Sequence, residues 1–164
     1  MKLLTKLSLM ALLAVLAFSC STDSIDDKAE AITQNLIIPA PKSIEVEILQ
    51  LINNHRLSMG LNPLESMGLI KSQAFNHTDY MVDKNVVNHD NFYARSAFLK
   101  QNAGAVKVSE NVAYGYTSAQ SVVNAWIKSE SHRANIEGDF SDFDISAETN
   151  SEGKWYYTNI FIKK

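Results

Sequence analysis

The chain has 164 residues, of which 46% are hydrophobic and 20% are charged, and its formal net charge is −3. This length allows one domain and is too short for two, and the hydrophobic content is that of an ordinary folded protein. The acidic balance excludes the basic face that binding to phosphates requires, so we expect no nucleic-acid partner.

Residues 1–19 have the pattern of a signal peptide. Lys2 and Lys6 give a positively charged start, and residues 7–18 are apolar apart from Ser8. This stretch is too short to span a bilayer, which takes roughly 20 residues, but it suits the apolar part of a signal peptide. We therefore expect an exported protein.

Cys20 follows the apolar stretch almost directly and is the only cysteine in the sequence. A lone cysteine at this position resembles the acylation site of a bacterial lipoprotein. The alternative is a plain secretory signal that contains a cysteine. The lipoprotein interpretation makes the membrane a partner through the lipid and predicts a cell-envelope location, with the outer membrane and the cell surface as candidates.

Residues 20–42 are predicted to form a flexible tether, because they contain an acidic run and end in Pro39-Ala40-Pro41. The domain is then predicted to occupy residues 43–164. Ser43 is expected to cap the first helix, whose apolar residues recur at helical spacing until Gly60.

A second helix is predicted from about Glu65 to Lys84, followed by a polar loop at 85–91 and a short helix over 92–101. Residues 106–115 have the composition of a strand.

The C-terminal part begins with a helix that runs to about Ile127, for which Thr117 and Gln120 are the expected capping box. A short turn at 132–136 comes next. Strands are predicted at 143–149 and 154–162, joined by a hairpin turn. Helices come first and strands of an antiparallel sheet close the chain, an order typical of the α+β class.

Common catalytic signatures are absent from the sequence, including Gly-x-Ser-x-Gly, His-Glu-x-x-His and a phosphate-binding glycine loop. What remains is a set of polar residues with apolar neighbours. They are His89, Glu110, Asn111, Ser129, His132, Arg133 and Asn135.

Two of these polar stretches resemble a known family. Residues 110–113, Glu-Asn-Val-Ala, resemble the Glu-Asn-(Ile/Leu/Val)-Ala signature of the CAP superfamily, whose members are also called SCP-like proteins. Residues 126–136 resemble the Trp-x-x-Ser-x-x-His-Arg-x-Asn-Ile motif of its bacterial members. Weaker similarities follow the family order at 53–64, 74–81 and 156–161. The chain is thereby identified as a member over residues 44–161.

The resemblance implies a three-layer α-β-α sandwich with a central antiparallel sheet and a surface cleft. Fuller members of the family place two His and two acids in that cleft, where these residues can hold a divalent metal. His89 matches the first His and Glu110 the first acid, whereas Ser129 and Tyr156 stand where the other two would be. His132, from the bacterial motif, is the candidate replacement.

The resemblance also implies the candidate site residues. The predicted cleft residues are His89, Glu110, Asn111, Tyr114, Ser129, His132 and Tyr156. Tyr116 is a further candidate for ligand contact. Asp144 and two serines, Ser109 and Ser146, replace glycines that the family prefers, and we expect them to reshape the backbone near the cleft.

His89, Glu110 and His132 could form a three-ligand site with an open fourth position, which suits zinc. Glu110 is then the best candidate for a catalytic residue. The competing interpretation is that Glu110 and His132 pair within a polar seam between helix and sheet, as buried polar groups require.

Three functions are consistent with these residues. The missing half of the tetrad favours a binding or interaction module, whose ligand would be a small apolar molecule, a glycan or a protein surface outside the cytoplasm. A divalent-metal-dependent hydrolase and a structural envelope protein are the alternatives.

Overall fold

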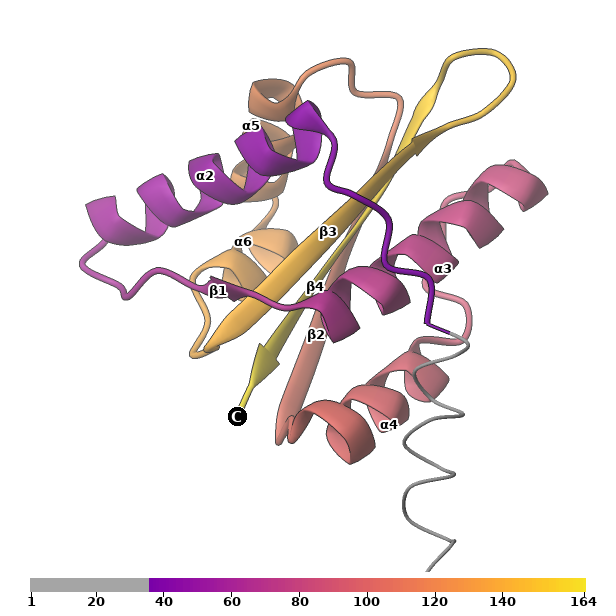
Figure 1. Ribbon diagram of the computed structural model, residues 1–164. Coiled ribbons are helices and arrows are strands. Elements are labelled where there is room, and N and C mark those ends of the chain that lie inside the picture. The colour runs from indigo at the N-terminus through magenta and orange to yellow at the C-terminus, as the bar shows by residue number, and fades with distance from the viewer. Residues whose placement is uncertain (1–35) are drawn as a thin grey trace, which may run out of the picture. The chain divides into compact units, whose positions relative to one another are not determined.

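The computed structural model of the chain describes residues 36–164 (Figure 1). The predicted signal peptide, Cys20 and the first part of the predicted tether lie outside these residues. In chain order the elements are α2 (Ser43–Ser58), β1 (Glu65–Ser66), α3 (Gly68–Lys84), α4 (Phe92–Ala103), β2 (Lys107–Tyr114), α5 (Ala119–Lys128), α6 (Glu130–Ile136), β3 (Asp142–Thr149) and β4 (Trp155–Lys163). Within 36–164, every helix is too short or too polar to cross a membrane.

The sheet has the strand order β1-β3-β4-β2, so β1 and β2 are its outer strands. β2, β4 and β3 are antiparallel to one another, but β1 runs parallel to β3 through Glu65–Asp142 and Ser66–Phe143. The three long strands form the predicted antiparallel sheet, and β1 adds a parallel edge that was not predicted, so the sheet as a whole is mixed.

The pairing of β1 also corrects the predicted start of the second helix. The Glu65 N–H donates to the Ser141 carbonyl at 3.1 Å, which holds residues 65–66 in extended backbone. α3 therefore begins at Gly68 instead of Glu65.

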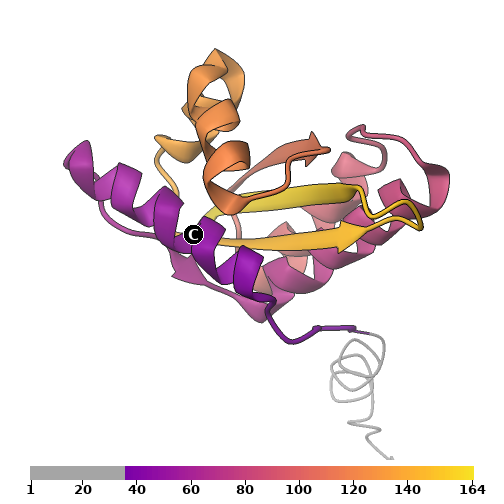
Figure 2. The same cartoon turned by 90° about the horizontal axis from the view of Figure 1, so that it is seen from above.

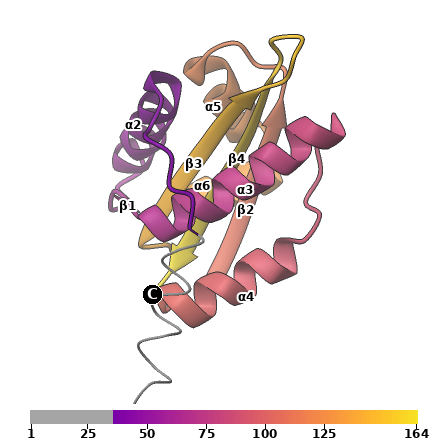
Figure 3. The same ribbon diagram turned by 45° about the vertical axis from the view of Figure 1, so that its right-hand side comes forward.

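The helices form two layers around the sheet, as the view from above shows (Figure 2). α3 and α4 cover one face, and α2, α5 and α6 cover the other (Figure 3). The side of α2, α5 and α6 holds the larger apolar core, which includes Ile52, Trp126 and Phe161. A smaller core under α3 and α4 includes Ile70 and Leu99. The α+β class and the three-layer architecture are confirmed.

Two predicted helix caps are one residue from the observed ones. Lys42, not Ser43, precedes α2, and its backbone N–H donates to Glu45 Oε2 at 2.7 Å. At α5 the reciprocal pair is Ser118 and Ser121, with the Ser121 N–H 3.2 Å from Ser118 Oγ. The hydroxyls of Ser118 and Ser121 reach the free backbone groups of the first helical turn. The predicted pair would have done the same one residue earlier.

Candidate functional site

Glu110 lies in β2 on the face covered by α3 and α4, and its side chain is 1% exposed. Arg95 of α4 binds it in a bidentate manner, with Nε 2.8 Å from Oε2 and Nη2 2.8 Å from Oε1. His89 Nδ1 lies 2.8 Å from Oε1. A buried carboxylate is tolerated when it is paired and fully hydrogen-bonded, and these contacts meet that condition.

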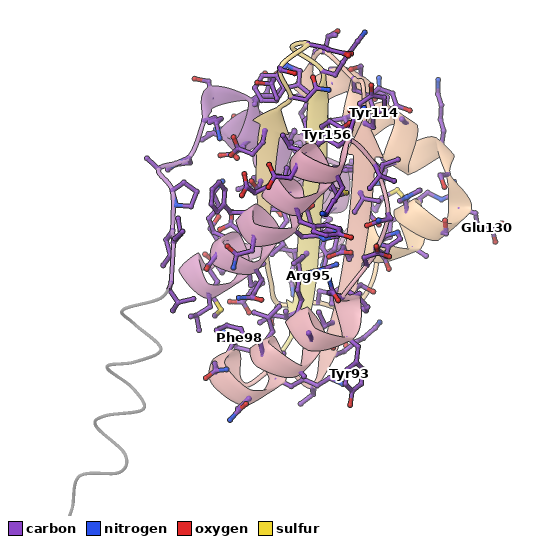
Figure 4. The ribbon with its side chains drawn as sticks, turned by 90° about the vertical axis from the view of Figure 1, so that its right-hand side faces the viewer. Tyr93, Arg95, Phe98, Tyr114, Glu130 and Tyr156 are labelled. Carbon is purple, nitrogen blue, oxygen red and sulfur yellow. The ribbon has the colours of Figure 1, made fainter. Side chains whose placement is uncertain are left out.

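Arg95 is the functional residue that sequence reasoning missed. It follows Phe92 by three residues and precedes Phe98 by three, so it lies on the apolar stripe of α4. A charged residue on such a stripe signals a buried partner, because charged side chains are almost never fully buried unless paired. Figure 4 shows Arg95 between α4 and the sheet, whereas Tyr93 of the same helix points away from the domain.

Asn111 is fully buried and lies on the opposite face from Glu110, because successive strand residues alternate between faces. Its Nδ2 donates to the His132 carbonyl at 3.0 Å. Asn135 Nδ2 donates to Asn111 Oδ1 at 2.8 Å and lies 3.3 Å from the Glu110 carbonyl. The Glu-Asn pair therefore fastens both helix layers to the same strand.

His132 lies in α6 with Nδ1 2.7 Å from Ser129 Oγ, at the junction between α5 and α6. Burial lowers the pKa of His132 below its ordinary value, and the nearby imidazole of His89 lowers it further. His132 is thus biased toward its neutral form. The predicted pairing of Glu110 with His132 is not formed: Glu110 bonds to Arg95 and His89 instead.

A pocket of about 540 Å³ lies at the outer edge of β2, between the 85–91 loop and the α5–α6 junction. Four of the predicted cleft residues line it, as does Tyr116. The four are His89, Tyr114, Ser129 and His132. Trp126 forms part of the wall, and its indole Nε1 donates to the Val112 carbonyl at 3.1 Å.

The other three predicted cleft residues lie behind the pocket wall. Glu110 supports His89, and Asn111 holds the backbone of His132. Tyr156 is 2% exposed, and its hydroxyl donates to Asn85 Oδ1 at 2.7 Å. Its ring centroid lies 4.7 Å from that of Tyr114, and Figure 4 shows the two rings together near one end of the sheet.

Metal binding gets no support from the described side chains. Within residues 36–164, there is no group of three or more His, Cys, Asp or Glu side chains that could hold a metal ion. His89 and His132 share the pocket, but both oxygens of Glu110 are hydrogen-bonded by Arg95 and His89. The zinc site therefore stays a prediction.

Asp144 and Ser146 lie away from the pocket at β2, contrary to the expectation that they reshape the cleft. Both are in β3, on the face that α3 covers, and Asp144 lines a different cavity. Side chains in β3 cannot reach the outer edge of β2, because β4 lies between the two strands.

Comparisons with known proteins agree with this architecture. Solved structures that resemble the chain include an outer surface protein from Borrelia burgdorferi, with a TM-score of 0.64 and 20% identity over 71% of this chain and 90% of that one. An extracellular SCP-domain protein from Bacillus anthracis gives a TM-score of 0.65 and 22% identity over 77% of this chain and 45% of that one. At these identities the likeness shows the fold.

Two curated relatives come from Bacillus subtilis. The uncharacterized membrane protein YlbC is 31% identical over 73% of this chain and 34% of its own length. The uncharacterized protein YkwD is 32% identical over 66% of this chain and 44% of its own length. The chain thus spans less than half the length of either relative.

The family model of the cysteine-rich secretory proteins, CAP, matches residues 49–161. That range runs from α2 to β4 and contains every residue of the site described above. The chain therefore belongs to the CAP family of cysteine-rich secretory proteins.

Proposed function

We propose that this chain is a binding module of the cell envelope, whose pocket at the edge of β2 takes a small uncharged ligand with hydroxyl groups, such as a glycan. The observation that supports this most directly is the convergence of His89, His132, Tyr114 and Tyr116 on one pocket of about 540 Å³. This volume is within the usual range for small-molecule sites.

The chemistry of the pocket favours a neutral ligand. Its lining residues include no Asp, Glu, Lys or Arg, so a charged ligand would lose hydration without gaining an opposite charge. Imidazole and serine side chains can donate hydrogen bonds to the hydroxyl groups of a ligand and can also accept hydrogen bonds from them. Aromatic rings at the rim provide an apolar surface, and Tyr114 and Tyr116 are 42% and 36% exposed.

The test is a screen of soluble glycans against the full chain, followed by titration of any glycan that binds. Tyr116→Ala and His132→Ala should each weaken binding by roughly tenfold or more, the usual effect of losing one good pocket contact. Tyr93→Ala is the matched control, because Tyr93 is 86% exposed and lies on α4, outside the pocket. Equal effects of Tyr116→Ala and Tyr93→Ala would contradict the proposal.

The module is further proposed to be held to the membrane by a lipid on Cys20. Support comes from the sequence, in which the lone cysteine follows a charged start and an apolar stretch. The names of similar proteins are consistent with a place at the membrane: the protein from Borrelia burgdorferi is described as an outer surface protein, and YlbC is named a membrane protein.

Anchoring is tested by fractionating cells that express the chain or its Cys20→Ala variant. The unchanged chain should be found in the membrane fraction and the variant outside it. A signal peptide alone could delay release of the protein from the membrane. The mass of the mature N-terminus should therefore also be measured, because it shows whether the cysteine is modified. Retention of the variant in the membrane together with an unmodified cysteine in the unchanged chain would refute the lipid anchor.

A further inference from the structure

The structure holds a second cavity, separate from the pocket at β2 and independent of the function proposed for it. It measures about 610 Å³ and lies between the extended segment 36–42, α2, and the start of α3. Its walls are largely apolar, and they include Ile38, Pro39, Val46 and Leu49.

The 36–42 segment forms one wall of this cavity and contacts the first residue of α3. A Cβ atom added to Gly68 would lie 3.2 Å from Ile38 Cδ1, so Ile38 packs directly over this glycine. The cavity is therefore built by the segment in its observed position.

Two ionisable side chains, Lys71 and Asp144, line the floor of the cavity. Lys71 Nζ lies 2.6 Å from Glu45 Oε2 and donates to the Ile145 carbonyl at 2.8 Å. Glu45 in turn accepts the Ala147 N–H through Oε1 at 2.8 Å. The charges of Lys71 and Glu45 therefore balance each other in a closed, buried pair.

Asp144 has no such partner. Asp144 is 9% exposed, and its Oδ1 accepts the Ile145 N–H at 2.9 Å. Among the ion pairs within residues 36–164, none includes Asp144. Buried carboxylates are normally paired with a cation, so the floor of this cavity presents one carboxylate that has no ion-pair partner among residues 36–164.

We propose that this cavity is a ligand site for a small molecule with a protonated amine and an apolar body. The ammonium group pairs with the carboxylate of Asp144, and the apolar body lies against Val46, Leu49 and Pro39. A neutral ligand would leave the carboxylate unpaired, and an anionic ligand would add repulsion to its cost of burial.

The ionisation of Asp144 gives the site a pH dependence. Burial raises the pKa of Asp144 to about 6; Lys71 of α3 opposes this shift, and Glu45 of α2 adds to it. The carboxylate therefore forms as the pH rises through about 6. Binding of an amine that stays protonated should be stronger at pH 7.5 than at pH 5.

The test is calorimetric titration of the full chain with cyclohexylamine, cyclohexanol and cyclohexanecarboxylate, three probes with the same ring. Cyclohexylamine should bind roughly tenfold more tightly than the other two at pH 7.5, which is the usual gain from a charge-assisted hydrogen bond. Asp144→Asn should remove that preference. Asp139→Asn is the matched control, because Asp139 is an exposed acid that lies outside this cavity.

A second variant tests the walls. Val46 is 40% exposed, so Val46→Phe can place a larger ring in the cavity without disturbing the core. It should abolish binding of cyclohexylamine while leaving the melting curve in place. The proposal is overturned if cyclohexylamine does not bind at millimolar concentration, if Asp144→Asn leaves its preference intact, or if Val46→Phe leaves its affinity unchanged. None of these outcomes bears on the pocket at β2.

Discussion

Arg95 and Glu110 form two parallel hydrogen bonds of 2.8 Å across the interface between α4 and β2, with both side chains at most 7% exposed. His89 approaches the same carboxylate from the 85–91 loop. The arrangement places one negative and one positive charge inside the domain, directly behind a residue of the candidate pocket. Its loss should affect stability and the position of His89 together.

Removal of Arg95 is the strongest stability prediction. Arg95→Met leaves a buried carboxylate without its cation, which typically costs on the order of 3–5 kcal/mol. Urea unfolding should show a large fall in the free energy of unfolding for this variant. Lys100→Met, an exposed change on the same helix, should alter it little. The double variant Arg95→Met/Glu110→Gln should recover part of the loss, and a cost for Arg95→Met no larger than that of Lys100→Met would contradict the prediction.

Asn111 should prove to be a structural residue. Asn111→Ala removes the donor to the His132 carbonyl and one of the two acceptors of the Asn135 amide. The expected cost is on the order of 1–3 kcal/mol. Hydrogen exchange should report where the loss occurs, with faster exchange in α6 than in α3. Uniform acceleration through both helices would show that Asn111 does not fasten α6 in particular.

Asp144 should destabilise the domain at neutral pH. Its pKa is raised from 3.8 to about 6, so the folded state holds its proton more tightly than the unfolded state does. The stabilising effect of the protonated form is complete below pH 3.8 and is lost as the pH rises through about 6. Asp144→Asn should therefore raise the free energy of unfolding at pH 7.5, on the order of 1–3 kcal/mol, with the gain shrinking toward pH 4. If Asp144→Asn raised the free energy of unfolding by the same amount across this pH range, the result would contradict a raised pKa for Asp144.

His77 should act in the opposite direction. It is buried in α3, and its Nε2–H donates to the Asn88 carbonyl at 2.9 Å. Burial lowers the pKa of His77 below 6.5, while the Asn88 hydrogen bond and Glu110 oppose the shift. The unfolded state then takes up a proton first, so this contribution to stability is present above pH 6.5 and is lost as the pH falls below it.

The measurement is the free energy of unfolding at pH 5.5 and 7.5, for the unchanged chain and for His77→Gln. His77 contributes to the change in the free energy of unfolding between pH 5.5 and pH 7.5. That contribution should disappear in the variant. The ring resonances of His77 should also titrate below pH 6.5. A normal or raised titration midpoint would show that burial does not dominate at this residue.

Much of the fold follows from hydrophobic spacing along the chain. The helices from α2 to α5 and the strands β2, β3 and β4 were predicted within a few residues of their observed bounds, because each buries an apolar face. β1 was missed, since two residues carry no periodicity and their pairing with β3 depends on a partner far along the chain. The register of Glu65 with Asp142 is a tertiary effect that no local pattern reports.

The sequence suggests candidate site residues but does not predict their contacts. His89 and His132, which the family resemblance suggests as cleft residues, both line the pocket at β2. The family resemblance does not indicate that Glu110 pairs with Arg95, because Arg95 lies outside the family motifs. The cavity floored by Asp144 was invisible for a different reason: its walls come from segments that are far apart in the sequence, and only their packing creates the space.

Side-chain donors from α5 and α6 bond to backbone carbonyls of β2, and this limits how β2 can pair with another molecule. β2 is an outer strand, and an unprotected outer strand can recruit the backbone of another molecule. The carbonyls of Glu110 and Val112 are already occupied by Asn135 and Trp126, so two of the acceptors that a foreign strand would need are taken from within. α5 and α6 thus occupy part of this edge, which disfavours pairing with a strand of another molecule.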